Sequence, residues 1–504
     1  MDYYVVSFSS AQINLFPSYL CRFFRNTETK KKPPSRAIHI WKGTLIMKNY
    51  DVIWIGTGQA TSTVVPRLVD AGKTVAIVEG DRVGGTCVNY GCTPTKTLVA
   101  SARAAHMARR GSDFGVNISD FTIDFDKVMA RQNNIRHGNS KGLENWLVSM
   151  EGVDLYKGYA QFENDHHVRI GDEIISGETI ALNVGTRPVT LPIPGLSDVP
   201  WLDNARLLDL KELPQHLLIV GGSYIGMEFA QAFRRFGSEV TIIEAMPQLM
   251  LREDADIAQS AKEILEREGI NIVLGAKVQQ VTQAGENAIA VSYEHDGKPT
   301  SVTGSHLLVA VGRAPNSDKL TLKAAGVETN ERGFIPVNDI MQTNIPHIYA
   351  IGDVNGEGAF THTSVNDGEI FWDNYSGQDN RKLSDRIITY AMYIDPPLGR
   401  VGMTEKEARE SGRNVWMATR PMKEIARAKE KDETAGLIKI LVDADTEEFL
   451  GAAVLGIGGD EIINMFTAYM YTKQSYKLFR RAVLTHPTVS ELIPWILDDL
   501  EPLK

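Results

Sequence analysis

Cysteine is scarce in this chain of 504 residues, which contains only Cys21, Cys87 and Cys92. Three cysteines are too few for the disulfide framework of a small secreted domain, and such sparse usage is typical of proteins from reducing compartments. We therefore expect a cytoplasmic protein in which any disulfide is catalytic or redox-sensing.

Long apolar runs and an excess of basic residues are also missing. No apolar stretch approaches the roughly 18 residues that indicate a membrane-spanning helix, so we expect no membrane partner. The formal net charge of -10 provides no basic field for a phosphate backbone, which disfavours nucleic-acid binding. With 43% hydrophobic and 23% charged residues, the composition is that of a globular protein of several domains.

Residues 1–46 differ from the rest of the chain, because they are basic and show no clean periodicity. An organelle transit segment is one interpretation, but the segment lacks a signal-peptide layout and its arginine content is modest. We favour a dispensable extension or an early start codon, since Met47 opens MKNYDVIWIGTG, where a strand-like pattern begins.

A glycine turn follows that first apolar strand. The stretch YDVIWIGTGQATSTVVPRLVDAGKTVAIVEG predicts a strand, a turn, an amphipathic helix and a second strand that ends at Glu79. In such a βαβ unit, Gly56 permits the tight turn, Gly58 lets the backbone approach a pyrophosphate, and Glu79 accepts the ribose hydroxyls. Thr61 stands where a third glycine or alanine usually allows close helix packing, so this fingerprint is incomplete.

The same pattern recurs in LLIVGGSYIGMEFAQAFRRFGSEVTIIEA. Gly221 and Gly226 occupy the first and third glycine positions, and Glu244 follows Gly221 at the interval that separates Glu79 from Gly56. Two copies with matched spacing predict two dinucleotides, or a nicotinamide dinucleotide and a flavin dinucleotide. A carboxylate at Glu244 accepts from a free ribose 2′-hydroxyl and repels a 2′-phosphate, so we expect NAD(H) in preference to NADP(H).

Two of the three cysteines lie close together in GGTCVNYGCTPTK. A structural zinc ion requires four ligands, and there is no second cysteine pair, so we expect no metal here. A structural bridge over so short a loop would constrain little of the unfolded chain. We therefore predict that Cys87 and Cys92 are a redox pair. Thr93 and Pro94 are predicted as the N-cap and first residue of a helix, whose N-terminus, with Lys96, would favour a thiolate at Cys92.

A histidine and a carboxylate lie near the C-terminus in HPTVSE, as His486 and Glu491. An imidazole oriented by a carboxylate can take and return a thiol proton near neutral pH. A His-Pro sequence alone is more often a polar surface turn. Beside a redox pair, we interpret these two residues as a candidate acid–base pair.

With these motifs assembled, the chain from about Lys48 onward resembles the pyridine nucleotide-disulfide oxidoreductases with a CxxxxC motif, which include dihydrolipoamide dehydrogenase, glutathione reductase and mercuric reductase. The resemblance implies an α/β homodimer with two Rossmann-like dinucleotide-binding domains and a C-terminal α+β dimerisation domain. The implied parts are an N-terminal extension at 1–46, an FAD-binding domain at 47–198, an NAD-binding domain at 199–325, a central domain at 326–385 and an interface domain at 386–504.

The resemblance also implies a role for each site residue. Cys92 would face the flavin, and Cys87 would exchange with the substrate. Lys96 and Glu228 would form an ion pair beside the flavin. The implied cofactor contacts are Gly56, Gly58, Glu79, Thr86 and Asp353 for FAD, and Gly221, Tyr224, Gly226, Glu244 and Gly312 for NAD.

The active site of such an enzyme is shared between subunits, so His486 and Glu491 would reach it from the partner subunit. Tyr224 resembles the aromatic residue that covers the nicotinamide pocket. Electrons would then pass between NAD(H), FAD, the cysteine pair and a small-molecule or protein-bound disulfide or dithiol.

The substrate stays open at this point. The stretch CVNYGCTPTK is nearer to mercuric-reductase-like members, yet no cysteine follows Cys92, so the C-terminal thiols that would hand over a mercuric ion are missing. We expect disulfide reduction or dithiol oxidation, as in dihydrolipoamide dehydrogenase. The alternatives are a mercuric reductase-like enzyme, an NADH oxidase or diaphorase without a thiol substrate, and a nucleotide-sensing protein without turnover.

Overall fold

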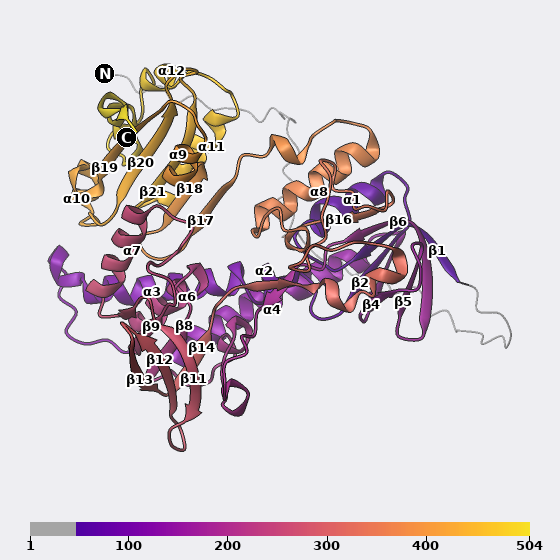
Figure 1. Cartoon of the computed structure of the whole chain (residues 1–504), viewed down its shortest axis with the longest axis horizontal. Coiled ribbons are helices and arrows are strands. Elements are labelled where there is room, and N and C mark those ends of the chain that lie inside the picture. Colours follow the sequence, from indigo (N-terminus) through magenta and orange to yellow (C-terminus); the bar gives the residue numbers. More distant parts are fainter. Residues whose placement is uncertain (1–46, 504) are drawn as a thin grey trace, which may run out of the picture. The chain divides into compact units, whose positions relative to one another are not determined.

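The computed structural model describes residues 47–503 of the chain (Figure 1). The predicted N-terminal extension at 1–46, with Cys21, lies outside the described residues. Within the described part, no helix is both long enough and apolar enough to cross a membrane.

The first sheet has seven strands and combines a parallel part with an antiparallel edge. Its strands are β1 Lys48–Ile55, β2 Val75–Glu79, β3 Val153–Lys157, β4 Ala160–Phe162, β5 His167–Ile170, β6 Glu173–Leu182 and β16 Ile348–Ala350. The order is β3-β2-β1-β6-β5-β4, and β16 pairs with β6. Neighbours among β3, β2, β1, β6 and β16 are parallel, whereas β4 and β5 run antiparallel to their neighbours.

Strand β1 is apolar on both sides because both faces of this sheet are covered. Val52 and Trp54 pack in one core with helix α1, Thr61–Asp70. Ile53 packs on the opposite face, in a core that β4 and β5 share. A parallel strand covered on both faces reads as a continuous hydrophobic run, as the sequence does here.

The second sheet repeats this plan with four parallel strands in the order β10-β9-β8-β14. Its strands are β8 His216–Val220, β9 Glu239–Ile243, β10 Asn271–Val273 and β14 His306–Val309. One face packs against helices α6, Tyr224–Phe236, and α7, Ala255–Arg267. The other face packs against an antiparallel sheet of β11 Lys277–Gln283, β12 Ile289–His295 and β13 Lys298–Gly304. The predicted repetition of the dinucleotide-binding unit is therefore confirmed.

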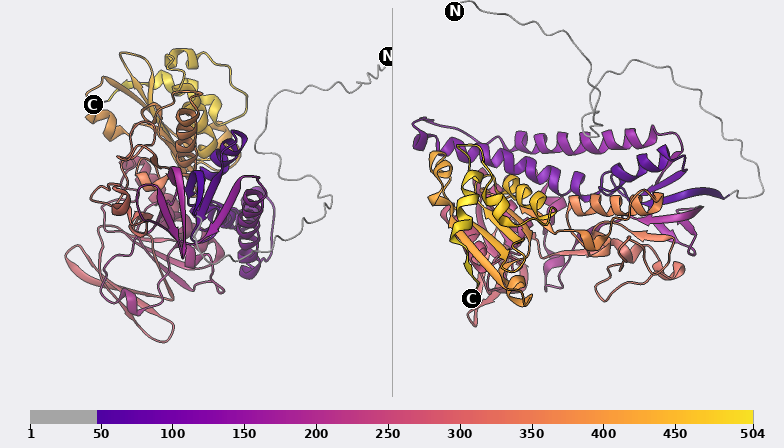
Figure 2. Two further views of the ribbon diagram at one scale, coloured as in Figure 1. Left: turned by 90° about the vertical axis from the view of Figure 1, so that its right-hand side faces the viewer. Right: turned by 90° about the horizontal axis from the view of Figure 1, so that it is seen from above.

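A long helical crossover connects β2 with β3 and carries both cysteines. It consists of α2 Gly85–Asn89, α3 Cys92–Arg109 and α4 Phe125–Val148. Helices α3 and α4 lie side by side (Figure 2), and α3 also packs against α6 of the second sheet. The helix that begins at the second cysteine thus joins the two nucleotide-binding units.

The predicted start of α3 was wrong by two residues. The helix begins at Cys92, with Gly91 as its cap, rather than at Pro94 with Thr93 as the cap. Pro94 is tolerated inside the first turn because the backbone N–H that it lacks has no partner within the helix there. Cys92 is therefore the first helical residue and not merely a neighbour of the helix.

The C-terminal part forms a separate antiparallel sheet of six strands in the order β17-β18-β21-β20-β19-β22. These are β17 Thr389–Met392, β18 Leu398–Gly402, β19 Val415–Pro421, β20 Leu437–Asp443, β21 Phe449–Leu455 and β22 Glu501–Pro502. Helices α9 Glu405–Glu410, α10 Ala426–Glu430, α11 Gly459–Met470, α12 Tyr476–Arg480 and α13 Ile493–Ile496 accompany it. Thr404 is the N-cap of α9, since its hydroxyl accepts from the Glu407 N–H.

Four further strands and helices lie between these parts of the chain. Strands β7 Thr186–Pro188 and β15 Arg313–Pro315 pair antiparallel and link the ends of the two parallel sheets. The short helix α5 is Asn204–Leu207, and α8 is Thr361–Ser376. The predicted class, two Rossmann-like units plus a C-terminal α+β unit, is confirmed.

Candidate active site

The two cysteines meet at a hydroxyl group that the sequence did not single out. Cys87 lies in α2 and Cys92 begins α3, and both are free thiols in the structure. The Oγ1 atom of Thr361, the first residue of α8, lies 2.9 Å from the Cys87 sulfur and 3.4 Å from the Cys92 sulfur. A segment about 270 residues away in the chain therefore completes the thiol pair.

The environment of the pair separates the two thiols electrostatically. The hydrogen bond from the Cys87 thiol lowers the pKa of Cys92 to about 6; burial opposes this, and the Thr361 hydroxyl and Lys96 reinforce it. The same hydrogen bond, with burial, raises the pKa of Cys87. Near neutral pH the pair therefore holds one proton, on Cys87, and one thiolate, at Cys92 at the N-terminus of α3.

Lys96 and Glu228 form a buried ion pair between α3 and α6. The Lys96 Nζ lies 2.8 Å from one carboxylate oxygen and 3.0 Å from the other. Burial lowers the pKa of Lys96, but the Glu228 carboxylate outweighs this effect and raises the pKa overall. Glu228 also accepts from the Tyr393 N–H at 2.8 Å, and Lys96 lies 4.6 Å from the centre of the Tyr393 ring.

The two glycine turns have the same construction. Gly56 has φ of 91° and Gly221 has φ of 111°, a region that side chains disfavour. A Cβ on Gly56 would lie 2.4 Å from the Asn183 carbonyl oxygen, and one on Gly221 would lie 2.4 Å from the Ala310 carbonyl oxygen. In each unit the turn therefore rests against the backbone at the end of a neighbouring parallel strand.

The acidic residues at the ends of β2 and β9 also match. Glu79 accepts from the Thr57 N–H at 2.9 Å and from the Asp81 N–H at 2.8 Å. Glu244 accepts from the Gly222 N–H at 2.6 Å and from the Met246 N–H at 2.8 Å. Both carboxylates are thus fixed beside their glycine turns, where the sequence predicted ribose contacts.

The third position of the glycine motif differs between the two units, and the second position is closely packed in the first unit. A Cβ on Gly226 would lie 2.2 Å from the Gly221 carbonyl oxygen, so a side chain does not fit there. Thr61, at the equivalent position of the first unit, is fully buried and its hydroxyl accepts from the Trp54 indole N–H at 2.8 Å. A Cβ on Gly58 would lie 2.5 Å from the Asn183 side chain, a packing constraint that the pyrophosphate argument did not foresee.

An arginine that the sequence analysis missed lies between Thr86 and Asp353. Arg313 donates to the Thr186 hydroxyl at 2.7 Å and to the Thr86 hydroxyl at 3.3 Å, and Thr186 donates in turn to Asp353 at 3.0 Å. Burial raises the pKa of Asp353, and burial lowers the pKa of Arg313. The only signal in the sequence was a charged residue directly after Gly312, which has φ of 130°.

Tyr224 is the first residue of α6 and follows the second glycine turn directly. Its hydroxyl donates to Glu253 at 2.7 Å, and the Tyr390 hydroxyl donates to the same oxygen at 2.6 Å. Glu253 is fully buried and also pairs with Arg400 at 2.8 Å. Tyr224 is therefore held by a network that spans the second sheet and the C-terminal sheet.

His486 and Glu491 are brought together as predicted, but not beside the cysteines of the same chain. The His486 Nδ1 lies 2.9 Å from one Glu491 oxygen and 3.1 Å from the other. The His486 side chain is 78% exposed, whereas Glu491 is largely buried. No hydrogen bond or ion pair connects His486 with Cys87 or Cys92 among residues 47–503.

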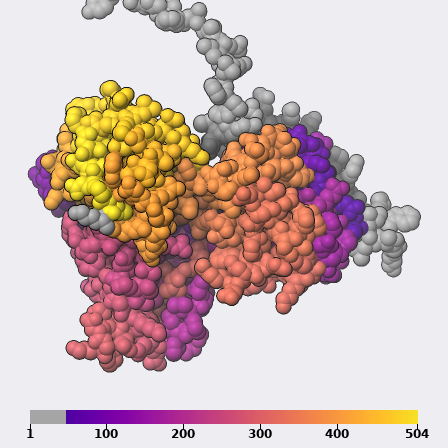
Figure 3. Space-filling model, turned by 45° about the horizontal axis from the view of Figure 1, so that its top comes forward, coloured from indigo at the N-terminus to yellow at the C-terminus, as the bar shows by residue number. Residues whose placement is uncertain are grey.

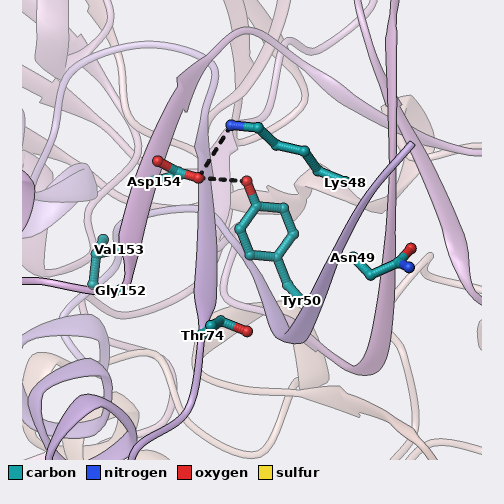
Figure 4. A pocket seen from close by; sticks show the side chains of 7 residues that line it. All are labelled: Lys48, Asn49, Tyr50, Thr74, Gly152, Val153 and Asp154. Carbon is teal, nitrogen blue, oxygen red and sulfur yellow. Dashed lines mark hydrogen bonds and ion pairs between the residues drawn. The ribbon is translucent and has the colours of Figure 1, made fainter. Parts of the chain in front are cut away.

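A recess of about 250 Å³ lies away from these groups, at the start of β1 (Figure 4). It is lined by Lys48, Asn49, Tyr50, Thr74, Gly152, Val153 and Asp154. Asp154 accepts from the Tyr50 hydroxyl at 2.6 Å and pairs with Lys48 at 3.4 Å, so the polar groups satisfy one another. The glycine turn follows the opposite end of β1, and we therefore assign no part of the thiol chemistry to this recess.

Comparison with known proteins agrees with this geometry. Residues 50–368 match the model of the pyridine nucleotide-disulphide oxidoreductase family, and residues 388–497 match that of its dimerisation domain. The chain is 38% identical to the probable pyridine nucleotide-disulfide oxidoreductase RclA of Escherichia coli, over 88% of this chain and 98% of that protein. It is 33% identical to a mercuric reductase of Lysinibacillus sphaericus, over 82% of this chain and 76% of that protein.

A dihydrolipoyl dehydrogenase of Bacillus subtilis is 32% identical over 87% of this chain and 96% of its own length. A solved structure described as the Cu(II) complex of the HOCl-induced flavoprotein disulfide reductase RclA from Escherichia coli has a TM-score of 0.82 at 37% identity. It covers 90% of this chain and 99% of that one. The chain therefore belongs to the pyridine nucleotide-disulphide oxidoreductases, a family of flavoprotein enzymes that act on sulfur groups with a pyridine nucleotide.

Proposed function

We propose that this enzyme passes electrons between NADH and a disulfide or dithiol substrate through Cys87 and Cys92. The observation that carries the proposal is the asymmetric thiol pair, with its shared Thr361 hydroxyl and a Cys92 pKa of about 6. A stabilised thiolate next to a protonated partner is what thiol–disulfide exchange requires.

The chain's own residues account for the exchange steps. Cys87 loses its proton and attacks one substrate sulfur, which breaks the substrate disulfide and forms a mixed disulfide. The Cys92 thiolate then attacks the Cys87 sulfur, which breaks the mixed disulfide and leaves a Cys87–Cys92 disulfide. The second substrate sulfur departs as a thiolate and takes its proton from solvent. His486 of the partner subunit, oriented by Glu491, takes the Cys87 proton and returns it to the sulfur that leaves in the first attack.

The first glycine turn fits a flavin dinucleotide. Gly56 keeps the turn free of a side chain, and helix α1 presents its N-terminus to a pyrophosphate. A Cβ on Gly85 would lie 3.2 Å from the Gly58 Cα, so the segment that leads to Cys87 runs against this turn. When bound, the flavin supplies hydride and electron transfer between the nicotinamide and the thiol pair. We propose that residues 47–198, completed by 326–385, hold it.

The second glycine turn supports NADH as the preferred nucleotide, within residues 199–325. Glu244 is fixed beside this turn, where its carboxylate accepts hydrogen bonds and would repel a 2′-phosphate. We expect a higher kcat/KM with NADH than with NADPH, and a smaller difference in Glu244→Ala. A clear NADPH preference in the unmodified enzyme would contradict this assignment.

A homodimer with shared active sites completes the proposal. The C-terminal residues, yellow in Figure 3, lie at the surface, where Val483 is 99%, Trp495 61% and Leu478 56% exposed. Exposed apolar side chains in a segment that matches the dimerisation domain of the family support an interface between subunits. The exposed His486 lies in the same stretch of chain.

The thiol step is tested by trapping the cysteines with a mass-labelled alkylating agent. Anaerobic NADH should convert the oxidised protein into a form in which both Cys87 and Cys92 are alkylated, whereas the form without NADH should resist. The flavin-loaded Cys92→Ser variant should still oxidise NADH with artificial acceptors but reduce no disulfide. NADH oxidation that leaves both cysteines unlabelled would favour the diaphorase alternative.

The substrate class requires a separate panel of lipoamide, glutathione disulfide and protein disulfides, assayed in both directions. Relatives described as a mercuric reductase and as a Cu(II) complex make Hg²⁺ and Cu²⁺ the appropriate additional arms. We expect turnover of a disulfide. Turnover of a metal ion alone, with every disulfide inactive, would replace the disulfide proposal.

A further inference from the structure

Three potential metal ligands lie together at the antiparallel edge of the first sheet. Asp165 and His166 come from the turn between β4 and β5, and His347 directly precedes β16. One ligand atom of each residue lies within 4.8 Å of those of the other two. The sequence analysis predicted no metal site, and these residues take no part in the proposed thiol chemistry.

The hydrogen bonds of the two imidazoles define their tautomers. The His166 Nδ1 lies 2.9 Å from the Gly177 carbonyl oxygen, and the His347 Nε2 lies 2.9 Å from the Asp165 carbonyl oxygen. A carbonyl only accepts, so each of these nitrogens donates and the other ring nitrogen of a neutral imidazole keeps a lone pair. Metal-binding histidines are usually prepared in this way, with the second nitrogen bonded to a backbone carbonyl.

The backbone also holds both histidines against β6. The His166 carbonyl accepts from the Gly177 N–H at 3.0 Å, and the His347 carbonyl accepts from the Ile180 N–H at 2.9 Å. Two residues that are 181 positions apart are thus placed by the same strand. A metal ion would therefore bind to residues whose backbone is already ordered. The entropy cost of binding is lower than for a flexible segment.

The two imidazole rings are stacked, with centres 4.0 Å apart and planes 1° from parallel. A metal ion lies in the plane of each imidazole that binds it, so at least one ring must tilt out of the stack. His166 is exposed, and nothing in its burial prevents such a tilt.

We propose that Asp165, His166 and His347 bind a divalent transition ion, Zn²⁺ being the representative. Two imidazoles and one carboxylate suit borderline ions of this class, and water would complete a tetrahedral shell. No lysine or arginine pairs with the Asp165 carboxylate within residues 47–503. The carboxylate therefore has no competing cation in the described part of the chain.

The other potential cluster of ligands differs in this respect. Asp254, Asp256 and Glu405 surround the Lys439 ammonium, which lies 2.7 Å from Asp256 and 2.6 Å from Glu405. Lys439, together with Arg400 at Asp254 and Arg409 at Glu405, already pairs with these carboxylates, so we assign no metal ion to them.

Zn²⁺ binding is measured by equilibrium dialysis and calorimetry on the full-length, flavin-loaded chain, with Cys21, Cys87 and Cys92 all replaced by serine. We expect one saturable Zn²⁺ per chain and a melting temperature that rises with Zn²⁺ concentration. His166→Ala, His347→Ala and Asp165→Asn should each weaken binding by about tenfold or more. Excess Mg²⁺ should not displace the ion, because Mg²⁺ prefers oxygen ligands.

Two further variants separate loss of ligation from loss of structure. His166→Gln and His347→Gln keep an N–H donor for the backbone carbonyls but offer no imidazole, so they should lose Zn²⁺ while the metal-free melting temperature is retained. His295→Ala is the matched control, because His295 lies 3.6 Å from the Asp296 carboxylate without a second histidine. A Zn²⁺ affinity in His166→Ala or His347→Ala equal to that of the chain with both histidines, no saturable binding, or displacement by Mg²⁺ would each overturn the proposal.

Discussion

At the scale of single residues, the Thr361 hydroxyl helps to lower the pKa of Cys92, after the larger effect of the Cys87 thiol. Thr361→Val removes the hydroxyl but keeps the shape of the side chain, so we expect the Cys92 pKa to rise from about 6 by about one unit. Thr361→Ser keeps the hydroxyl and should retain the original value. The pKa is measured as the pH dependence of Cys92 alkylation in the reduced protein. A pKa in Thr361→Val equal to that of the parent would show that the contact does not act on the thiolate.

The low Cys92 pKa also predicts how the reduced enzyme responds to pH. In the folded protein the pKa of Cys92 is about 6, below the ordinary value of 9.0 for a cysteine thiol. The thiolate therefore contributes its full stabilisation above pH 9.0, and this contribution is lost as the pH falls through about 6. Alkylation of Cys92 should therefore be fast at neutral pH and slow below about pH 6. Cys87, whose pKa is raised, should react more slowly over the same range. Equal pH profiles for the two cysteines would contradict the assignment of the thiolate.

Lys96 is expected to stabilise the folded protein through its ion pair with Glu228. Lys96→Met leaves the Glu228 carboxylate without its cation, with only 6% of that side chain exposed, and should lower the free energy of unfolding by about 1–3 kcal/mol. Adding Glu228→Gln should recover part of the loss, because the amide can still accept from the Tyr393 N–H. Chemical denaturation measures both effects. The control is Lys406→Met, since the exposed pair of Lys406 with Glu410 should contribute no more than about 0.5 kcal/mol.

At the scale of elements, two glycines in helices should respond oppositely to alanine. Gly226→Ala would place a Cβ 2.2 Å from the Gly221 carbonyl oxygen, so we expect a loss of about 1–3 kcal/mol of stability and weaker NADH binding. Gly138→Ala, in the exposed face of α4, meets no atom within 4 Å and should stabilise the protein by about 0.4–1 kcal/mol. Thermal unfolding compares the two. Stabilisation by Gly226→Ala would show that the turn can move away from the helix.

These elements also show what local sequence patterns can predict. The strands, glycine turns and terminal acids were predicted because each depends on residues within about 25 positions of one another. The start of α3 was misplaced because Thr93 and Pro94 fit the usual preferences for an N-cap and a first helical residue, whereas the helix begins two residues earlier, with Gly91 as its cap.

At the scale of the whole molecule, the limits of sequence reasoning concern contacts between distant segments. Thr361 follows Cys92 by 269 residues, and no local pattern connects the two. Arg313 escaped notice for the same reason, since its contacts with Thr86 and Thr186 arise only when β7 and β15 pair. The cysteine motif and the effect of Lys96 on it could be interpreted from nearby residues, but the contact of Thr361 with both sulfurs could not.

The proposal that each active site is shared between two subunits can be tested by mixing two inactive variants. Cys87→Ser chains lack the exchange thiol and His486→Gln chains lack the acid–base group, so each homodimer should be nearly inactive in disulfide reduction. If His486 serves the partner subunit, a heterodimer of the two contains one site with both defects and one intact site. Random reassociation of equal amounts should then restore about a quarter of the parent activity, because half of the dimers are mixed and each has one working site of two.

The matched control joins both substitutions in one chain and mixes it with the parent. These heterodimers have one defect in each site and should be inactive, so the mixture should also retain about a quarter of the parent activity, contributed only by parent homodimers. Restored activity in the first mixture requires a subunit-crossing histidine, because a histidine acting on its own chain would leave every site defective. An inactive first mixture, with heterodimers verified by native mass spectrometry, would contradict the proposal that the exposed His486 serves the partner subunit.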